Sequence, residues 1–93
     1  MKKVHQKIGA LIREHRIKSN LSQLDVAREL GYESPQFVSM FERGLCKIPY
    51  ETIGHLIVLL GLPERKTLEI LVEAYKAEIN AKITVGKKSA KKR

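Results

Sequence analysis

Residues 21–44, LSQLDVARELGYESPQFVSMFERG, carry the signals of two short helices separated by a tight turn. Ser22 can cap the first of them, and Asp25 stands three residues later, near the positive end of the helix dipole. Gly31 is typical of the residue just past a helix end, where a left-handed backbone is common. The stretch therefore predicts a helix that begins after Ser22 and stops at Gly31, with a second helix behind it.

The second helix of the pair, within residues 33–44, has two competing faces. Ser34 can cap it, and Pro35 suits the first helical position, where no N–H is needed. Val38 and Phe41 are spaced i, i+3, as a stripe facing the core requires. A different side of the same helix carries Gln36, Phe37, Met40 and Arg43.

The rest of the chain predicts an all-α fold, because no stretch alternates apolar and polar residues for long enough to form a strand. Apolar residues at helical spacing predict three further helices, over about residues 3–18, 50–60 and 63–82. We expect one domain over residues 1–82, followed by a basic, disordered tail over residues 83–93. The expected apolar stripes are Val4, Ile8, Leu11 and Ile12; Ile53, Leu56, Ile57 and Leu60; and Leu68, Leu71, Val72, Tyr75 and Ile79.

The net charge of +8 is unevenly distributed. Residues 87–93 carry five basic residues and no acidic one, which leaves +3 for residues 1–86 (13 basic, 10 acidic). Such a tail is typical of a nucleic-acid arm or of a solubilising end. No apolar run approaches the roughly 18 residues of a membrane span, and the N-terminus lacks a signal-peptide core. We therefore expect a cytoplasmic protein, and the single Cys46 excludes an internal disulfide.

Two capped helices joined by a tight turn outline a helix-turn-helix. At residues 21–44, and at the following KIPYETIGHLIVLLGL (47–62), the chain resembles the lambda-repressor/Cro-like helix-turn-helix family. The resemblance lies in the Ser-Gln pair, the Leu-Gly spacing, the Val-Ser pair, the closing Glu-Arg-Gly and the final Leu-Gly-Leu. It covers about residues 8–62, and the turn at residues 31–34 is one residue longer than in the commonest members. The resemblance implies a five-helix DNA-binding domain with the motif at helices 2 and 3.

In that family the third helix lies in the major groove of DNA. Ser34, Gln36 and Met40 match the family's base-facing positions. The amide of Gln36 can pair bidentately with adenine, and Phe37 and Met40 can contact thymine methyl groups. The alternatives are core or dimer packing for Phe37, plain packing for Met40, and a solvated side chain for Gln36.

Other matches concern the DNA backbone and the support of the third helix. Gln23 matches the family's phosphate clamp. Arg43 and Lys47 flank the loop where relatives touch the other strand's backbone, although basic residues are also often simply solvated. Arg16 and Glu42 match a family pair in which the first helix's arginine reaches the glutamate at the end of the third.

The last two helices carry more apolar surface than one side can bury, which favours a homodimer. The residues expected at its interface are Leu68, Leu71, Val72 and Tyr75. The resulting hypothesis is a sequence-specific DNA-binding transcription regulator, a repressor, that acts as a homodimer on a two-fold operator. Two alternatives are an antitoxin, which also binds a toxin protein, and a protein-interaction bundle with no DNA role.

Catalytic and metal-binding signals are missing from the sequence. His5, His15 and His55 lack ligand spacing with Cys46, and no glycine-rich phosphate loop occurs. We expect no enzymatic activity, no cofactor, no metal and no small-molecule ligand.

Overall fold

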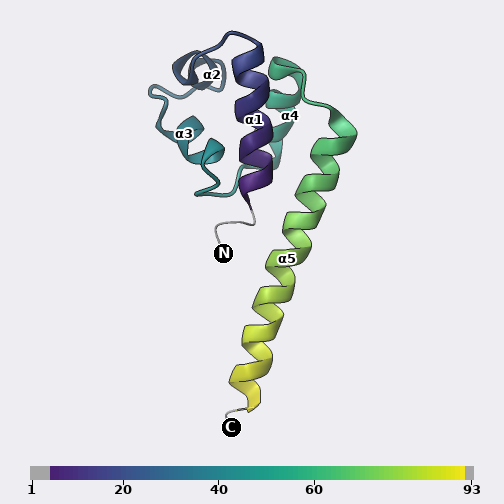
Figure 1. Ribbon diagram of the computed structural model, residues 1–93. Helices are drawn as coiled ribbons and strands as arrows, with labels where there is room; N and C mark the ends of the chain where they lie inside the picture. Colours follow the sequence, from purple (N-terminus) through teal and green to yellow (C-terminus); the bar gives the residue numbers. More distant parts are fainter. Residues whose placement is uncertain (1–4, 92–93) are drawn as a thin grey trace.

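The computed structural model describes residues 5–91, and over that range it contains five α-helices and no strand (Figure 1). This confirms the predicted all-α class. None of the helices in this part of the chain is long and apolar enough to cross a membrane. The helices are α1 (Gln6–Lys18), α2 (Gln23–Glu29), α3 (Gln36–Glu42), α4 (Tyr50–Leu60) and α5 (Glu64–Lys91).

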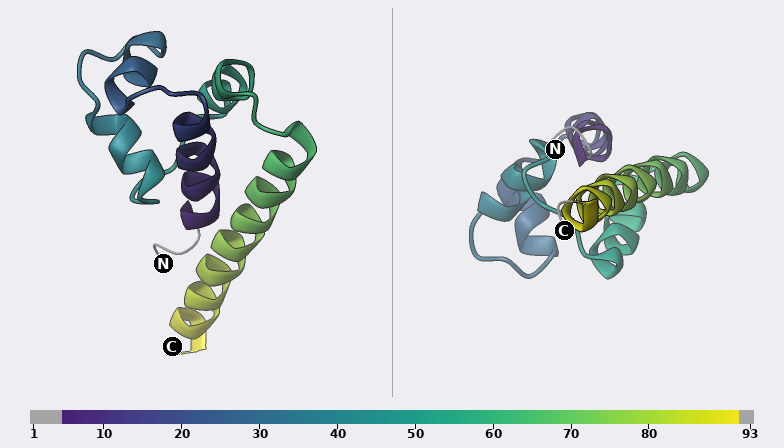
Figure 2. Two further views of the ribbon diagram at one scale, coloured as in Figure 1. Left: turned by 45° about the horizontal axis from the view of Figure 1, so that its top comes forward. Right: turned by 90° about the horizontal axis from the view of Figure 1, so that it is seen from below.

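Helix α1 lies at the centre of a compact part, residues 5–62, which we call the head. It contacts α3, α4 and α5, while α2 packs on α3 (Figures 1 and 2). Apolar side chains at helical spacing along α1 and α4 face inward, as that spacing predicts. The buried core comprises Ile8, Leu11, Ile12, Val26, Ala27, Val38, Phe41, Ile48, Ile53, Leu56, Leu60 and Leu62. Of the expected α1 stripe, Val4 lies outside the described residues.

Helices α2 and α3 end in the same way. Gly31 and Gly44 adopt left-handed backbones, with φ of 87° and 70°. The next residue's N–H then reaches back to the last turn, from Tyr32 to the Ala27 carbonyl at 2.9 Å and from Leu45 to the Met40 carbonyl at 3.0 Å. These glycine-terminated ends satisfy carbonyls that a helix otherwise leaves unpaired.

The start of α3 differs from the sequence-based prediction. Ser34 does not cap the helix; Pro35 occupies the N-cap position, with no side-chain cap. The Pro35 carbonyl accepts the first helical hydrogen bond, from the Ser39 N–H at 2.9 Å. Because the backbone becomes helical only at Gln36, the hydroxyl of Ser34 is one residue too early to reach the first-turn donors. At α2 the predicted capping box between Ser22 and Asp25 is present.

Gly9 allows α1 and α3 to cross at close range. A Cβ atom added there would collide with the Phe41 carbonyl oxygen and lie 2.6 Å from that of Glu42. No other described glycine inside a helix has backbone atoms this near. The glycine is thus required for close contact between the two helices, rather than for backbone flexibility.

Helix α5 departs most from prediction. It continues to Lys91, past the expected end at residue 82, so the expected disordered tail from residue 83 is helical as far as the structure describes it. Residues 82–91 contain no proline, and extending an existing helix costs less than nucleating one. On the side that faces the head, Thr67 and Ala74 are buried, whereas Leu68, Val72, Tyr75 and Ile79 of the expected apolar stripe are exposed.

Candidate nucleic-acid interface

The residues that the sequence predicts as base readers lie on the exposed side of α3 and just before its first turn. Ser34 and Gln36 are exposed, Phe37 is half exposed, and Met40 is partly buried. The opposite side of the helix is anchored by Val38 and Phe41, both almost fully buried. The helix therefore presents a polar amide beside apolar side chains on a fixed surface.

Phe37 has a second contact that limits its freedom. Its ring stacks on Tyr32, with centroids 5.0 Å apart, and lies 6.3 Å from the ring of Phe41. Tyr32 sits in the segment between α2 and α3, so the aromatic row ties this segment to α3 and to the core. One side of Phe37 is used for packing, and the half that stays exposed is available to a partner.

A buried polar network around Glu42 joins α1, α2 and α3 on the inner side of α3. Its carboxylate accepts from Arg16 Nε at 2.5 Å and from Arg16 Nη2 at 3.1 Å. The side chains of Arg16 and Glu42 are 11% and 2% exposed. Arg16 Nη1 also donates to the Leu21 carbonyl at 2.8 Å. Because both charges are paired and hydrogen-bonded, the network fixes α3 against α1 without an orphaned buried charge.

Gln23 belongs to the same network. Its amide nitrogen donates to Glu42 Oε1 at 3.0 Å, which links the first turn of α2 to the end of α3. An amide nitrogen carries two hydrogens, so one remains for a phosphate oxygen. The network therefore fixes the side chain of Gln23, the residue that the family resemblance implies as a phosphate contact.

The structure separates the two basic residues that the sequence places beside the loop after α3. Arg43 is exposed at the end of α3, and its Nε reaches only its own helix, at the Ser39 carbonyl. Lys47 instead turns to α5: its Nζ is 3.8 Å from Glu78 and 5.5 Å from the centre of the Tyr75 ring. Arg43 thus shares a helix with the predicted readers, and Lys47 does not lie among them.

Three groups of the head have shifted acidities. A hydrogen bond from Lys18, together with its charge, lowers the pKa of Glu14. The backbone N–H of Ser22, and then its side chain, lower the pKa of Asp25, which keeps this α2 cap ionised. Burial raises the pKa of the Cys46 thiol. A thiol with a raised pKa is a poor nucleophile.

Sequence reasoning missed three contributors to this surface: Gly9, Tyr32 and the bond from Gln23 to Glu42. A glycine inside a helical pattern is a recognisable signal of close packing. The tyrosine lies in a turn without any periodicity. The amide bond joins residues 19 positions apart, which no local pattern encodes.

An exposed, anchored helix following a capped helix and a turn defines the class of this molecule as a DNA-binding helix-turn-helix protein. A family profile described as helix-turn-helix domain matches residues 7–70. The chain belongs to this family, which confirms the resemblance seen in the sequence. No curated protein matches the chain significantly. Among solved structures, the clp gene regulator ClgR from Corynebacterium glutamicum has the same fold, with a TM-score of 0.61 and 22% identity over 90% of this chain and 87% of that one.

Proposed function

We propose that the protein is a sequence-specific transcription regulator that binds a two-fold operator as a homodimer and represses by occupying promoter DNA. The observation that carries this proposal is the exposed side of α3. Gln36 offers the donor and acceptor pair that adenine complements in the major groove, and Phe37 and Met40 offer apolar contact for thymine methyl groups.

The fixed position of α3 supports base reading in particular. Hydrogen bonds to base edges discriminate only when the reading side chains are held in register with the groove. Here the Arg16–Glu42 pair fixes the end of α3 to α1, and the ring of Tyr32 packs on Phe37 near its start. Gln23 and Arg43 are proposed to contact the phosphates that position the helix.

The exposed side of α5 supports a homodimer. Leu68, Val72 and Tyr75 are each about half exposed, and Leu71 is partly buried beside them. Together with Tyr50 and Ile53 of α4, these residues line a shallow apolar groove. Burial of such a surface against a second copy would join two heads, and two copies of α3 then contact successive major grooves.

Repression follows from occupancy alone. A dimer that covers about two turns of promoter DNA excludes other proteins from it and needs no second activity. ClgR, whose structure has the same fold, is described as a gene regulator, and this agrees with the proposed regulatory role.

Selection of bound duplexes from a random-sequence pool tests the proposal. We expect enrichment of an inverted repeat whose half-sites are centred about 10 base pairs apart, because a two-fold dimer places its α3 helices one helical turn, about 34–36 Å, apart. A competing random duplex should not displace the protein from the enriched site at equal concentration. A pool that stays random after repeated rounds would contradict the proposal.

A further inference from the structure

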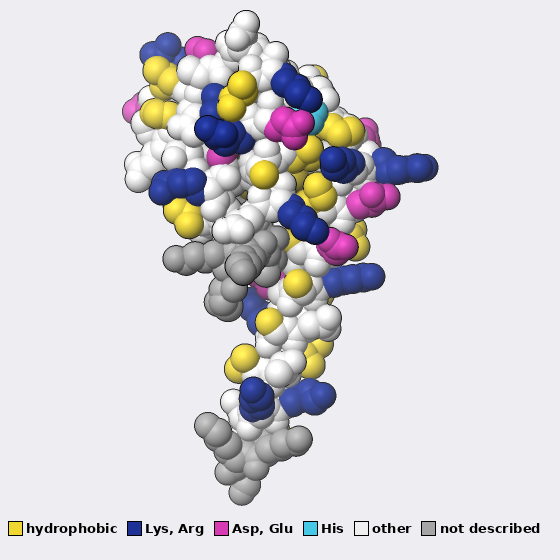
Figure 3. Space-filling model, viewed as in Figure 1, with side chains coloured by type: hydrophobic (Ala, Val, Ile, Leu, Met, Phe, Trp, Pro, Cys, Tyr) yellow, Lys and Arg dark blue, Asp and Glu magenta, His cyan; other side chains and the backbone are white. Residues whose placement is uncertain are grey.

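The end of α5 projects beyond the head (Figure 1). Residues 80–90 are all exposed, and α5 is about 42 Å long at a rise of 1.5 Å for each of its 28 residues. We call residues 79–91 the arm. Figure 3 shows apolar and basic side chains together on this projecting part. Its large apolar residues are Ile79, Ile83 and Val85.

Acidic residues are confined to one part of α5. All of its glutamates lie before the arm, at Glu64, Glu69, Glu73 and Glu78, and this part also carries Arg65, Lys66 and Lys76. The arm has no acidic residue; it has Lys82, Lys87, Lys88 and Lys91. A solubilising helix needs no such segregation, whereas a helix that meets an oppositely charged surface does.

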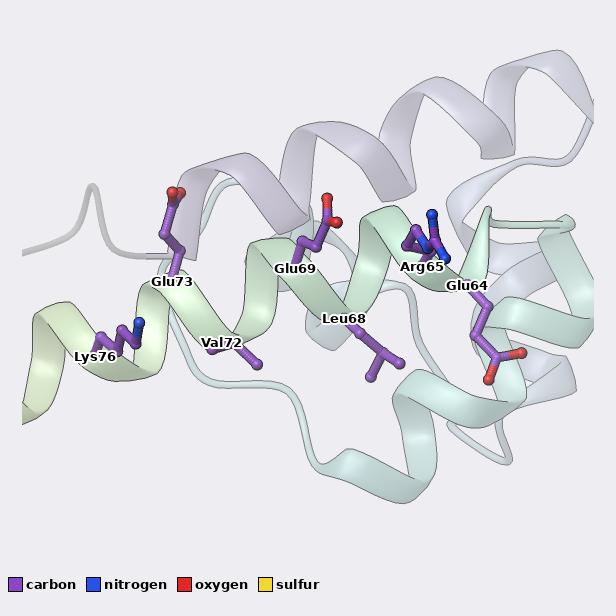
Figure 4. A pocket seen from close by; sticks show the side chains of 7 residues that line it. All are labelled: Glu64, Arg65, Leu68, Glu69, Val72, Glu73 and Lys76. Carbon is purple, nitrogen blue, oxygen red and sulfur yellow. The ribbon is translucent and has the colours of Figure 1, made fainter.

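The first half of α5 presents a surface that complements the arm. An open groove along it is lined by Leu68 and Val72, with the acidic residues Glu64, Glu69 and Glu73 at its edge and Arg65 and Lys76 completing it. Figure 4 shows Leu68 and Val72 on the side of α5 nearer α4 and the carboxylates of Glu69 and Glu73 on the side nearer α1. With three carboxylates against two basic groups, this apolar strip has an acidic balance, which matches a helix that carries isoleucines and lysines.

The two complementary surfaces cannot meet within one chain, because they follow each other along a single continuous helix. They do meet when two copies of α5 lie side by side in opposite directions. A two-fold axis then forms both contacts at once, arm on groove and groove on arm. A parallel arrangement would instead set glutamates beside glutamates and lysines beside lysines.

We propose that the arm docks on the first half of α5 of a second copy, in antiparallel orientation. This inference rests on the proposed homodimer and specifies its geometry. The contact would also account for the helical state of the arm, because a peripheral helical segment containing Gly86 and β-branched residues is marginal without a packing partner. The occupant of the groove is therefore the arm of an identical chain.

Charge reversal tests the orientation. One variant carries Glu69→Lys and Glu73→Lys, a second carries Lys82→Glu and Lys87→Glu, and a third combines all four changes. Sedimentation equilibrium without DNA measures the dimer dissociation constant of each. In a two-fold dimer every change counts twice, so we expect each pair alone to raise that constant at least about tenfold. The combined variant restores opposite charges and should return to within about threefold of the wild type.

A matched control separates orientation from net charge. Glu29→Lys with Glu33→Lys changes the net charge by the same amount as the Glu69→Lys, Glu73→Lys variant, but at exposed positions of the head. We expect this control to leave self-association unchanged. The exposed Lys7–Glu73 ion pair is lost in both the first and the third variant, so a difference between these two variants does not come from that pair.

Four outcomes would overturn the inference. A monomeric wild type removes the proposed homodimer and this geometry with it. If the wild type is a dimer and both charge-reversal variants keep its dissociation constant, the antiparallel geometry is excluded and the homodimer stands. A combined variant that keeps its helical circular dichroism yet fails to recover also excludes the antiparallel contact. If reversal in the arm lowers only the affinity for DNA, the arm is a nucleic-acid contact instead.

Discussion

The head and α5 use their apolar residues in opposite ways. In the head, the large apolar side chains at helical spacing along α1 and α4 are mostly buried, and the Arg16–Glu42 ion pair is buried with them. Along α5, by contrast, the inward face holds Thr67 and Ala74, while larger residues such as Val72 and Tyr75 remain exposed.

The difference separates stability from association. A side chain that is already buried contributes to folding of the single chain, and one that stays exposed contributes only when a partner covers it. Changes in the head should therefore lower the free energy of unfolding. Changes on the exposed side of α5 should affect self-association and leave the head folded.

The largest effect is expected at the buried pair of the head. Arg16→Ala leaves the Glu42 carboxylate, whose side chain is 2% exposed, with only Gln23 as a side-chain partner. We expect the free energy of unfolding to fall by about 3–5 kcal/mol in urea denaturation. Lys18→Ala is the control, because it removes an ion pair with Glu14 that is mostly exposed to water, and it should change little. Equal unfolding midpoints for the two variants would contradict the role given to the pair.

The next largest effect concerns the crossing of α1 and α3. Gly9→Ala places a methyl group against the carbonyls of Phe41 and Glu42, so we expect a loss of about 1–3 kcal/mol in thermal or urea unfolding. Gly54→Ala provides a matched control in α4, because nothing lies within 4 Å of its added Cβ. That change should stabilise the protein by about 0.5–1 kcal/mol. A stabilising Gly9→Ala would mean that the helices do not cross this closely.

A smaller effect on folding is expected on α5. Val72→Asp should weaken the dimer about 10- to 100-fold in sedimentation equilibrium, since it puts a charge into an apolar contact. The helical circular dichroism and the unfolding midpoint measured at monomeric concentration should be nearly unchanged, because Val72 is exposed in the single chain. Ile17→Asp, at an equally exposed position of α1, serves as the control. If Val72→Asp unfolds the chain, the division between head and α5 is wrong.

Local signals explain how much of the fold was predictable. The Ser22–Asp25 cap, the ends at Gly31 and Gly61, and the bounds of α4 all follow from residues within one helical turn of each other. The start of α3 was mispredicted because Ser34 and Pro35 each have a strong preference, and only the actual backbone decides which position each one takes.

Contacts between residues far apart in the sequence were harder to predict. The Gln23–Glu42 hydrogen bond depends on how α2 lies against α3, and the close approach at Gly9 depends on how α1 crosses α3. A single sequence does not show either arrangement. The face that α5 turns towards the head was not predicted, because periodicity finds an apolar stripe without saying whether the same chain or another copy covers it. For the candidate site, the exposure of Gln36 agrees with a reader, and its role stays a prediction.

The most direct test of the account compares Gln36→Ala with the wild type on two DNAs, the sequence selected from a random pool and a scrambled duplex of equal length. The account predicts that the variant keeps the wild-type unfolding midpoint, because Gln36 is exposed. It should lose about 1–3 kcal/mol of binding free energy, about 5- to 150-fold in dissociation constant, on the selected site only. Affinity for the scrambled duplex should be unchanged. An equal loss on both DNAs, or no loss on either, would contradict base reading by α3.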